Sequence, residues 1–555
     1  MSSTHTFEIL AECFRNEGAG VCFALLGDAN MNWASALADR GCEFFYVRDE
    51  HCAVAAAMAW ARSAGDVGVA TVTCGPGVTQ ILTALPAAVR ANIPLVIFAG
   101  EAPLGKPWYN QKINQRPFIE ACGARYDSLH HVASMPLQIR DAFLYARSNN
   151  QPVVLGVPFD LQELPWDQEF TAPQRSSKLL PVKSRLYPDQ RYLDMAVRMI
   201  TSAKRIVLIG GRGVIESAAS AKCVALADQT GALLATTLPA RGVFHDHSFC
   251  IGIAGGFASD TARRCLQQAD LIIAVGCRLA QHTSDSGKLF DSSAVLHIDT
   301  VPRSVSQGRV AAEHHLQCDA RAGIDAILAH LPACPVSQSG AGEWRSDVLA
   351  DEIKNAPADA ARFDIEDGLH DPRDVVSALD SAVPKDWFTV NSSGHCSWFT
   401  AQMKGRPADR FLTIREFGAI GNGIAFAMGV AAANREQTVV LFDGDGSLLM
   451  HIQELETIRR HNLNIIICVF NDGAYGSEIH KLRVEGLRED GTVFGRPDFA
   501  QIALGFGISG TCVDKLEDLD SLVALYKTRR GAAIWDFHVS DKVVSPVIRR
   551  SHHIK

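Results

Sequence analysis

The sequence predicts an α/β protein built from three doubly wound parallel-sheet domains. Short apolar runs of strand length alternate with helical patterns along all 555 residues, which is typical of parallel sheets. Two polar, proline-bearing stretches, near residues 164–188 and 334–372, divide this pattern into three segments. A chain of this length suits three or four domains. We therefore expect an N-terminal domain at 1–180, a central domain at 185–340 and a C-terminal domain at 365–555.

The N-terminal and central segments contain clear strand and helix patterns. Glu50 precedes a run of small apolar residues, 53–61, which predicts a closely packed helix that begins at Glu50. The residues that follow predict a strand, a Gly-Pro-Gly turn, a helix and a second strand, at 67–73, 74–77, 78–90 and 94–99. In the central segment, buried strands are expected at 205–210 and 270–275.

The C-terminal segment contains a predicted βαβ crossover with two oxygen-bearing side chains. An apolar run at 439–442 leads to Asp445 between two glycines, and a second run at 465–470 leads to Asn471. Between them, Ile452, Leu455 and Ile458 have helical spacing. Both polar residues then lie at the carboxyl ends of adjacent parallel strands, where open α/β sheets bind ligands. Carboxylate and amide oxygens suit Mg²⁺, and glycines let the backbone approach a diphosphate.

The bulk composition excludes several classes of protein. Hydrophobic residues make up 47% and charged residues 21%, as in ordinary globular proteins, and the net charge of −8 predicts neither nucleic acid nor an anionic membrane as a partner. No apolar run is long enough to span a bilayer, and the first residues do not resemble a signal peptide. Fifteen scattered cysteines without a CxxC motif predict reduced thiols in a cytoplasmic protein rather than disulfides or a zinc site.

The segment from Gly444-Asp445-Gly446 to Asn471 resembles the thiamine-diphosphate-binding motif, and the resemblance extends over the whole chain. The nearest groups are acetohydroxyacid synthases and 2-oxo acid decarboxylases. The resemblance implies a pyrimidine-binding, a central and a diphosphate-binding domain, with one topology shared by the first and third. It also implies a homodimer or homotetramer whose active sites lie at the subunit interface.

The resemblance assigns residues to each part of the cofactor. Glu50 would activate the cofactor from beside the aminopyrimidine ring, the Gly418 carbonyl would accept from the 4′-amino group, and Ile420 would separate the two rings. Mg²⁺ would be held by Asp445, Asn471 and the Gly473 carbonyl. The expected contacts of the diphosphate are Gly394, His395, Gly444, Gly446 and Ser447.

The residues expected to act on the substrate combine two patterns. Asp28, in a Gly-Asp-Ala-Asn loop, and Glu478 lie where 2-oxo acid decarboxylases carry acids, whereas the context of Gln115 resembles acetohydroxyacid synthases. The His-His pair of the decarboxylases is missing from 113–118, and His130-His131 lies too far along the chain to replace it.

We therefore expect decarboxylation of a 2-oxo acid and transfer of the acyl-anion equivalent to an aldehyde or ketone acceptor. The alternatives are a non-ligating 2-oxo acid decarboxylase, a lyase that cleaves 2-hydroxy ketones, and a non-catalytic binding protein. The glycine-rich turns at 210–213 and 276–278 lie where some relatives bind FAD, but an ordinary strand-to-helix turn is the favoured interpretation.

Overall fold

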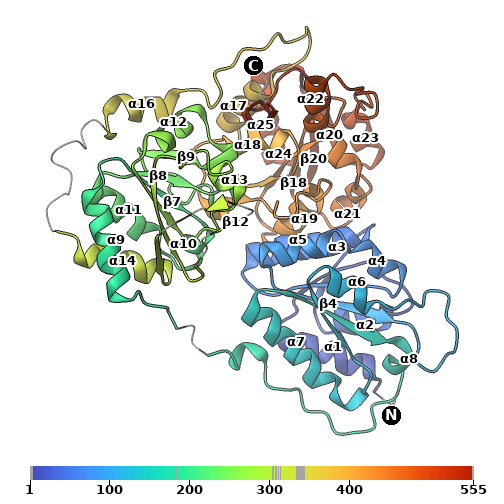
Figure 1. Ribbon diagram of the computed structural model, residues 1–555. Coiled ribbons are helices and arrows are strands. Elements are labelled where there is room, and N and C mark those ends of the chain that lie inside the picture. The colour runs from blue at the N-terminus through green and yellow to red at the C-terminus, as the bar shows by residue number, and fades with distance from the viewer. Residues whose placement is uncertain are drawn as a thin grey trace.

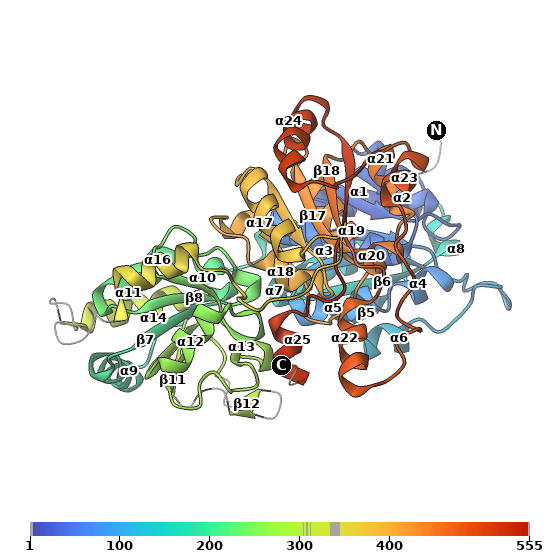
Figure 2. The same cartoon turned by 90° about the horizontal axis from the view of Figure 1, so that it is seen from above.

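The computed structural model describes residues 4–181, 184–302, 305–306, 309–310, 312, 314–332 and 344–552. It contains three six-stranded parallel sheets with helices on their faces, which confirms the predicted α/β class (Figures 1 and 2). A short antiparallel pair, β12 (Val305–Ser306) and β13 (Arg309–Val310), lies outside these sheets. The predicted domain limits at residues 1, 340 and 555 and the start of the second linker, 334–343, lie outside the described residues.

The N-terminal sheet has the strand order β2-β1-β3-β4-β6-β5. Its strands are β1 (Val21–Ala24), β2 (Glu43–Tyr46), β3 (Gly68–Val72), β4 (Leu95–Glu101), β5 (Arg125–Ser128) and β6 (Pro152–Pro158). The helices around it are α1 (Thr6–Glu17), α2 (Met31–Asp39), α3 (Glu50–Ala64), α4 (Pro76–Gln80), α5 (Ala84–Ala91), α6 (Arg116–Ala121), α7 (Met135–Asn149) and α8 (Phe159–Gln162).

The central sheet has the order β14-β11-β10-β7-β8-β9, which is the strand order of dinucleotide-binding folds. Its strands are β7 (Ile206–Gly210), β8 (Leu233–Thr236), β9 (Cys250–Ile253), β10 (Leu271–Val275), β11 (Ala294–Asp299) and β14 (His314–Gln317). The helices of this region are α9 (Gln190–Ser202), α10 (Arg212–Glu216), α11 (Ser220–Thr230), α12 (Asp260–Gln268), α13 (Gln281–Ser284), α14 (Ala320–His330) and α16 (Asp347–Asn355).

The C-terminal sheet has the order β16-β15-β17-β18-β20-β19, which repeats the order of the N-terminal sheet strand for strand. The two outer domains therefore share one topology, as expected. The strands are β15 (Phe388–Asn391), β16 (Phe411–Leu412), β17 (Val439–Gly444), β18 (Ile465–Asn471), β19 (Ser509–Cys512) and β20 (Ala532–His538). The helices are α17 (Pro372–Ala382), α18 (Cys396–Ala401), α19 (Gly423–Ala433), α20 (Asp445–Leu449), α21 (Glu454–Arg460), α22 (Gly476–Glu485), α23 (Phe499–Gly505), α24 (Leu519–Arg529) and α25 (Pro546–His552).

Two predicted helices are broken in the structure. The helix expected at 78–90 is divided into α4 and α5, because Pro86 has no N–H to bond the Leu82 carbonyl and fits only in the first turn of a new helix. The crossover after Asp445 also consists of two short helices, α20 and α21. Between them, the His451 ring nitrogen Nδ1 lies 3.0 Å from the Gly421 carbonyl, which fixes the break against a neighbouring loop.

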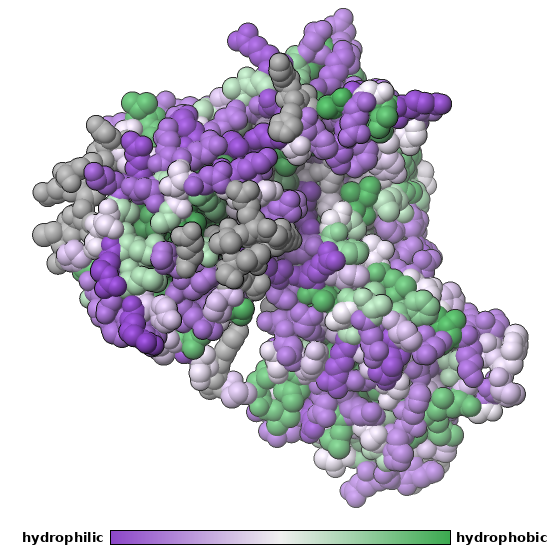
Figure 3. All heavy atoms as spheres, viewed as in Figure 1, coloured by the Kyte–Doolittle hydropathy of each residue, from purple (hydrophilic) through white to green (hydrophobic). Residues whose placement is uncertain are grey.

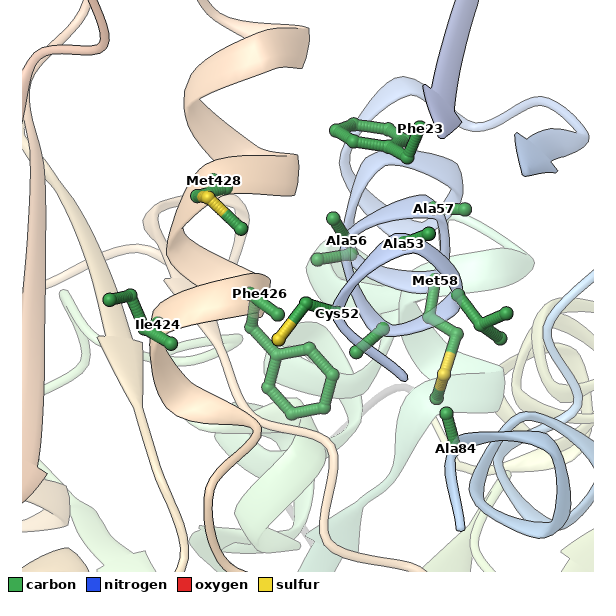
Figure 4. Close-up of a cluster of buried hydrophobic side chains, with 14 of the residues drawn as sticks. Phe23, Cys52, Ala53, Ala56, Ala57, Met58, Ala84, Ile424, Phe426 and Met428 are labelled. Carbon is green, nitrogen blue, oxygen red and sulfur yellow. The ribbon is translucent and has the colours of Figure 1, made fainter. Parts of the chain in front are cut away.

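The N-terminal and C-terminal domains meet through α3 and α19, which run side by side (Figure 4). His51 hydrogen-bonds Asn422 at the start of the pair, and Asn434 donates to the Ser63 hydroxyl at its end (2.9 Å). Small residues allow this close contact: a Cβ on Gly429 would lie 2.1 Å from the Ala56 carbonyl oxygen.

The same interface buries larger apolar side chains in one cluster that includes residues of both domains. Phe426 and Met428 from α19 and Met58 from α3 are almost completely buried there (Figure 4). Burial of each such side chain contributes about 1.5–3 kcal/mol. The pairing of the two helices thus fixes the start of α3, including Glu50, beside the C-terminal domain.

The outer edge of β2, the edge strand of the N-terminal sheet, is covered by side chains of the C-terminal domain. The Tyr46 amide donates to His461 Nε2 at 2.9 Å, and the Tyr46 carbonyl accepts from Arg460. Two residues on, the Arg48 amide donates to the Glu454 carboxylate at 2.8 Å. These contacts replace the hydrogen bonds that a further strand would make.

On the face shown in Figure 3, hydrophobic side chains are scattered among hydrophilic ones. Among the described residues, no helix is long and apolar enough to cross a bilayer. The 14 cysteines in the described part of the chain form no disulfides with one another, and Cys334 lies outside it.

Candidate active site

A pocket lies at the carboxyl edge of the C-terminal sheet, where β15, β17 and β18 end. Most of the residues predicted to bind the cofactor line it. They are Gly394, His395, Ile420, Gly444, Gly446 and Ser447. Asp445 and Glu478 also line this pocket, whereas Gly418, Asn471 and Gly473 are not among its lining residues. The βαβ unit and the loops around it therefore bring these residues together as the sequence predicts.

Asp445 is buried at the start of α20, and its carboxylate is held by backbone amides. Oδ1 accepts from Gly446 N–H at 2.7 Å and Oδ2 accepts from Gly473 N–H at 2.6 Å. Burial raises the pKa of Asp445, and the two amides oppose this rise. The carboxylate is thus fixed in place, with charge that a bound cation would stabilise.

Asn471, at the end of β18, has one side-chain oxygen without a partner among the described residues. Its Nδ2 donates to the Pro497 carbonyl at 2.9 Å and to Asp536 Oδ1 at 3.1 Å. Its Oδ1 is buried and has no hydrogen-bond partner among the residues that the structure describes. A buried amide oxygen without a partner is costly unless a ligand or water uses it, so this atom fits a metal ligand.

Asp472 is an acid in the pocket that the sequence analysis did not single out. Burial raises its pKa well above the usual value, and the nearby charge of Asp445 raises it further. A buried and a half-buried carboxylate that repel each other, with an unpaired amide oxygen next to them in the chain, form a donor set that fits a hard divalent cation. Its position directly after Asn471 could have suggested it.

The Gly473 carbonyl, predicted as the third metal ligand, has other partners in this structure. It accepts hydrogen bonds from the amides of Phe494 and Gly495, both at 3.0 Å. These two bonds use both lone pairs of the carbonyl oxygen. Asp472 is therefore better placed than Gly473 to supply a further oxygen to a metal ion. The role of Gly473 as a ligand stays a prediction.

Ser447 connects the segment of Asp445 to the loop that precedes α19. Its hydroxyl oxygen accepts from Gly421 N–H at 2.9 Å and lies 3.4 Å from the Ser392 hydroxyl. Beneath it, burial raises the pKa of Asp443 to about 7, although both serine hydroxyls act to lower it. Gly418, with φ at +77°, and Ile420 belong to the loop that Ser447 holds.

His395 is a neutral, half-buried imidazole at the pocket wall. Its Nε2 accepts from Ser545 N–H at 3.0 Å, so the ring proton must be on Nδ1. Burial lowers the pKa of His395 well below the usual value, and the nearby His480 lowers it further. Nδ1 lies beside Gly476, where a Cβ would approach within 3.0 Å. The N–H group is therefore available as a neutral donor to an anionic ligand.

Glu50 is the first residue of α3, as predicted, and Asp49 caps this helix by accepting from His51 N–H at 2.8 Å. Burial raises the pKa of Glu50, which favours its protonated form. Its carboxylate lies against the turn at 74–77, where a Cβ on Gly77 would be 3.2 Å from Oε1. The hydrogen bond between His51 and Asn422 brings the start of α3 to the loop of Ile420 in the same chain, because Asn422 follows Ile420 by two residues.

Thr73 lies beside Glu50 and was missed by the sequence analysis. A Cβ added to Gly27 would lie 2.7 Å from the Thr73 side chain, and a Cβ added to Gly77 would lie 3.0 Å from it. Thr73 therefore lies between the two loops that contain these glycines. Its hydroxyl is buried and lacks a partner within the described part of the chain. Such a hydroxyl is a plausible ligand contact, but a strand-end threonine carries no distinctive sequence pattern.

Asp28 and Glu478 are both exposed, and each lies on a well-held segment. The loop of Asp28 is fixed by Asn30, whose Oδ1 accepts from Gly27 N–H at 2.8 Å. Glu478 lies at the pocket, within 3.2 Å of Lys481 Nζ. Solvent access suits groups that exchange protons, and their catalytic roles stay predictions.

Gln115 is buried, and its amide is engaged by the protein itself. Oε1 accepts from Gly75 N–H at 2.8 Å, while Nε2 donates to the Gly100 carbonyl at 3.1 Å and to the Tyr126 hydroxyl at 3.0 Å. Both amide N–H groups are thus used. The geometry favours a structural role, in which Gln115 holds the turn at 74–77, over the predicted contact with a bound intermediate.

In the central domain, the two glycine-rich turns pack directly against each other. Gly211 N–H donates to the Val275 carbonyl and Gly213 N–H to the Gly276 carbonyl, both at 2.9 Å. A Cβ on Gly211 would lie 2.3 Å from the Gly276 oxygen. Close packing of the two turns accounts for these glycines, and the absence of FAD from this domain stays a prediction.

Three domain families match this sequence. They are the N-terminal TPP binding domain (residues 4–115), the central domain (193–327) and the C-terminal TPP binding domain (392–537) of thiamine pyrophosphate enzymes. Together they include all six strands of the central sheet, most strands of the two outer sheets and most residues of the pocket.

Curated relatives extend over most of the chain. The probable acetolactate synthase large subunit of Methanococcus aeolicus is 25% identical, with 92% of this chain and 88% of that protein aligned. Acetolactate synthase isozyme 2 large subunit of Escherichia coli (strain K12) is 27% identical over 92% and 91%. Chloroplastic acetolactate synthase 2 of Nicotiana tabacum is 29% identical over 84% and 71%. With its three matching domains in order, this chain belongs to the thiamine pyrophosphate enzyme family.

Proposed function

We propose that this protein is a thiamine-diphosphate- and Mg²⁺-dependent carboligase of the acetolactate synthase type. It would decarboxylate a 2-oxo acid and transfer the acyl-anion equivalent to an aldehyde or ketone. The observation that carries the proposal is the pair of acids Asp445 and Asp472 at the pocket, together with the unpaired Asn471 oxygen at the end of β18, within a chain aligned over most of its length with acetolactate synthases.

In this proposal the residues of the C-terminal domain bind and orient the cofactor. When bound, thiamine diphosphate supplies a nucleophilic carbon and an electron sink. Asp445, Asn471 and Asp472 would hold Mg²⁺, the Gly446 and Ser447 region would contact the diphosphate, and the neutral His395 would donate from Nδ1. Low-dielectric surroundings strengthen each of these contacts.

The N-terminal domain would supply the proton chemistry. Glu50, with a raised pKa, can hold a proton at the aminopyrimidine ring. Asp28 and Glu478 would move protons to and from the substrate carbonyl. We also propose the domain limits 1–180, 185–340 and 365–555 and a homodimer or homotetramer with active sites at the subunit interface.

A non-ligating 2-oxo acid decarboxylase is the second candidate. The segment 113–118 has no histidine, but the fold brings His130 to the end of β4, where its Nε2 lies 2.5 Å from Glu101 Oε2. A histidine at this edge could act as a proton donor that ends the reaction at the aldehyde stage. The two candidates differ in their products.

Product analysis tests the proposal. The protein, loaded with thiamine diphosphate and Mg²⁺, is given labelled pyruvate and a panel of 2-oxo acids and aldehydes, and the products are identified by mass spectrometry. We expect a labelled acetohydroxyacid or acyloin that the Asp445→Asn variant fails to make. Free aldehyde as the sole product would support the decarboxylase, and no turnover of any donor would leave a binding protein.

A further inference from the structure

The side-chain amide of Asn471 is held in one of its two possible orientations. Its Nδ2 lies 2.9 Å from the Pro497 carbonyl and 3.1 Å from Asp536 Oδ1, with Asp536 Oδ2 at 3.4 Å. A proline carbonyl and a carboxylate only accept hydrogen bonds. The donor end of the amide therefore faces Asp536, and the unpaired Oδ1 faces away from it.

Asp536 is itself rigidly placed. It lies in β20, next to β18, where it is paired in register with Val469 two residues before Asn471. The side chain is completely buried, and its Oδ2 accepts from Phe499 N–H, the first amide of α23, at 3.1 Å. Strand pairing and a helix start thus fix the carboxylate independently of any ligand.

The need for such a device follows from the symmetry of the amide group. The oxygen and nitrogen ends of an asparagine side chain have nearly the same shape, but only the oxygen can bind a cation. An amide that turned over would present two N–H groups to Mg²⁺. Residues that hydrogen-bond to a metal-ligating side chain commonly prevent this by fixing its orientation.

We propose that Asp536 is a positioning residue that orients Asn471, so that Oδ1 is presented to the metal ion. This inference rests on the proposed function, because that function places Mg²⁺ at Asn471. Asp536 does not touch the metal ion and acts through the amide nitrogen. The competing explanation is that Asp536 serves only to cap α23 through Phe499 N–H.

The Asp536→Asn variant separates the two explanations. An asparagine keeps an oxygen for Phe499 N–H, but its own NH₂ group then faces the Asn471 amide, which favours turning Asn471 over. We expect the affinity for Mg²⁺, measured by calorimetry in the presence of thiamine diphosphate, to fall about 10- to 100-fold. The thermal midpoint of the protein without cofactor should change little. Asp514→Asn, an exposed acid that accepts from Cys512, is the matched control and should leave the affinity unchanged.

A paired exchange provides a second measurement, including the case in which Asp536→Asn does not fold. In Asn471→Asp/Asp536→Asn, the new amide donates to the new carboxylate, which again offers an oxygen to the metal ion. We expect this pair to bind Mg²⁺ more tightly than Asp536→Asn alone, or, if that variant is unfolded, than Asn471→Ala.

The outcomes distinguish this inference from the proposed function. Wild-type affinity in Asp536→Asn, together with loss of affinity in Asn471→Ala, would overturn the positioning role and keep the metal site. Unchanged affinity in both Asn471→Ala and Asp445→Ala would show that Mg²⁺ binds elsewhere, which overturns the metal site and the positioning role together.

Discussion

The N-terminal and C-terminal domains have the same strand order but very different chemistry at corresponding strand ends. In the C-terminal sheet, β17 and β18 lead to Asp445, whose carboxylate accepts from two backbone N–H groups, and to Asn471, whose buried Oδ1 has no partner among the described residues. In the N-terminal sheet, β3 and β4 lead to the turn at 74–77 and to Glu101, where the protein's own side chains fill most of the hydrogen-bonding positions and only the Thr73 hydroxyl lacks a partner among the described residues.

In the N-terminal domain these side chains form a continuous network. Glu101 accepts from the Tyr126 hydroxyl and contacts His130, while Gln115 connects Tyr126 to Gly75. One topology thus serves two tasks: the C-terminal copy leaves donors and acceptors free for a ligand, and the N-terminal copy uses its own to hold the turn beside Glu50. The comparison teaches that the side chains at the strand ends, rather than the fold, distinguish the tasks of the two halves.

The largest expected effect comes from Glu50→Gln. Removing the proton-holding group should slow exchange of the cofactor C2 proton by about 10²- to 10⁴-fold, because general acid–base catalysis contributes that much. Binding of thiamine diphosphate should persist, since its anchor lies in the other domain. Exchange is measured by NMR in D₂O. Normal exchange in this variant would contradict the division of tasks between the two domains.

Gly429→Ala should weaken the contact between the two domains. The new methyl would lie 2.1 Å from the Ala56 carbonyl, so α19 and α3 must separate, and we expect a loss of about 3 kcal/mol in unfolding free energy. Urea titration measures this loss. Gly505→Ala, at a helical glycine with open space around it, is the control. Equal stability of the two variants would mean that the helix pairing is loose.

Tyr126→Phe tests the N-terminal network. Glu101 loses a donor and Gln115 loses an acceptor, both in a buried region, so we expect destabilisation by about 2 kcal/mol. Slower C2 proton exchange should accompany it if the network holds the turn beside Glu50. The exposed Tyr192→Phe serves as the control. A destabilised protein with unchanged exchange would restrict the network to stability alone.

The smallest effect concerns pH. Burial, aided by the charge of Arg460, lowers the pKa of His461 to about 4, and its Nε2 can accept from Tyr46 N–H only when unprotonated. A folded-state pKa below the unfolded value of about 6.5 gives stability that is present above pH 6.5 and lost as the pH falls towards 4. Because the ring is partly exposed, we expect about 1 kcal/mol.

Urea unfolding at several pH values measures this contribution. His461→Gln should flatten the change between pH 6.5 and 4. An identical pH profile in this variant would show that the Tyr46 contact does not control the acid response.

The sequence predicts the three sheets well because their strands are continuous apolar runs, as at 439–442 and 465–470, and it brings Asp445 and Asn471 together because they end adjacent strands. It does not reveal the role of Asp536. The contact of Asp536 with Asn471, 65 residues away in the chain, depends on the register of β18 and β20. Nor does it show that Gln115 is fully engaged, which depends on three contacts, one from the turn at 74–77 and two from the strands β4 and β5. The division of the helix at 78–90 was foreseeable from Pro86.

The cover over the edge of β2 has a consequence for how the chain is made. Tyr46 and Arg48 are synthesised early, whereas the side chains that cap their backbone groups, from Glu454 to His461, follow some 400 residues later. At the usual rate of about 5–20 residues per second, the N-terminal sheet waits for tens of seconds with an open edge. During that interval the strand can pair with another nascent chain, so the protein should depend on chaperones most strongly before its last domain emerges from the ribosome.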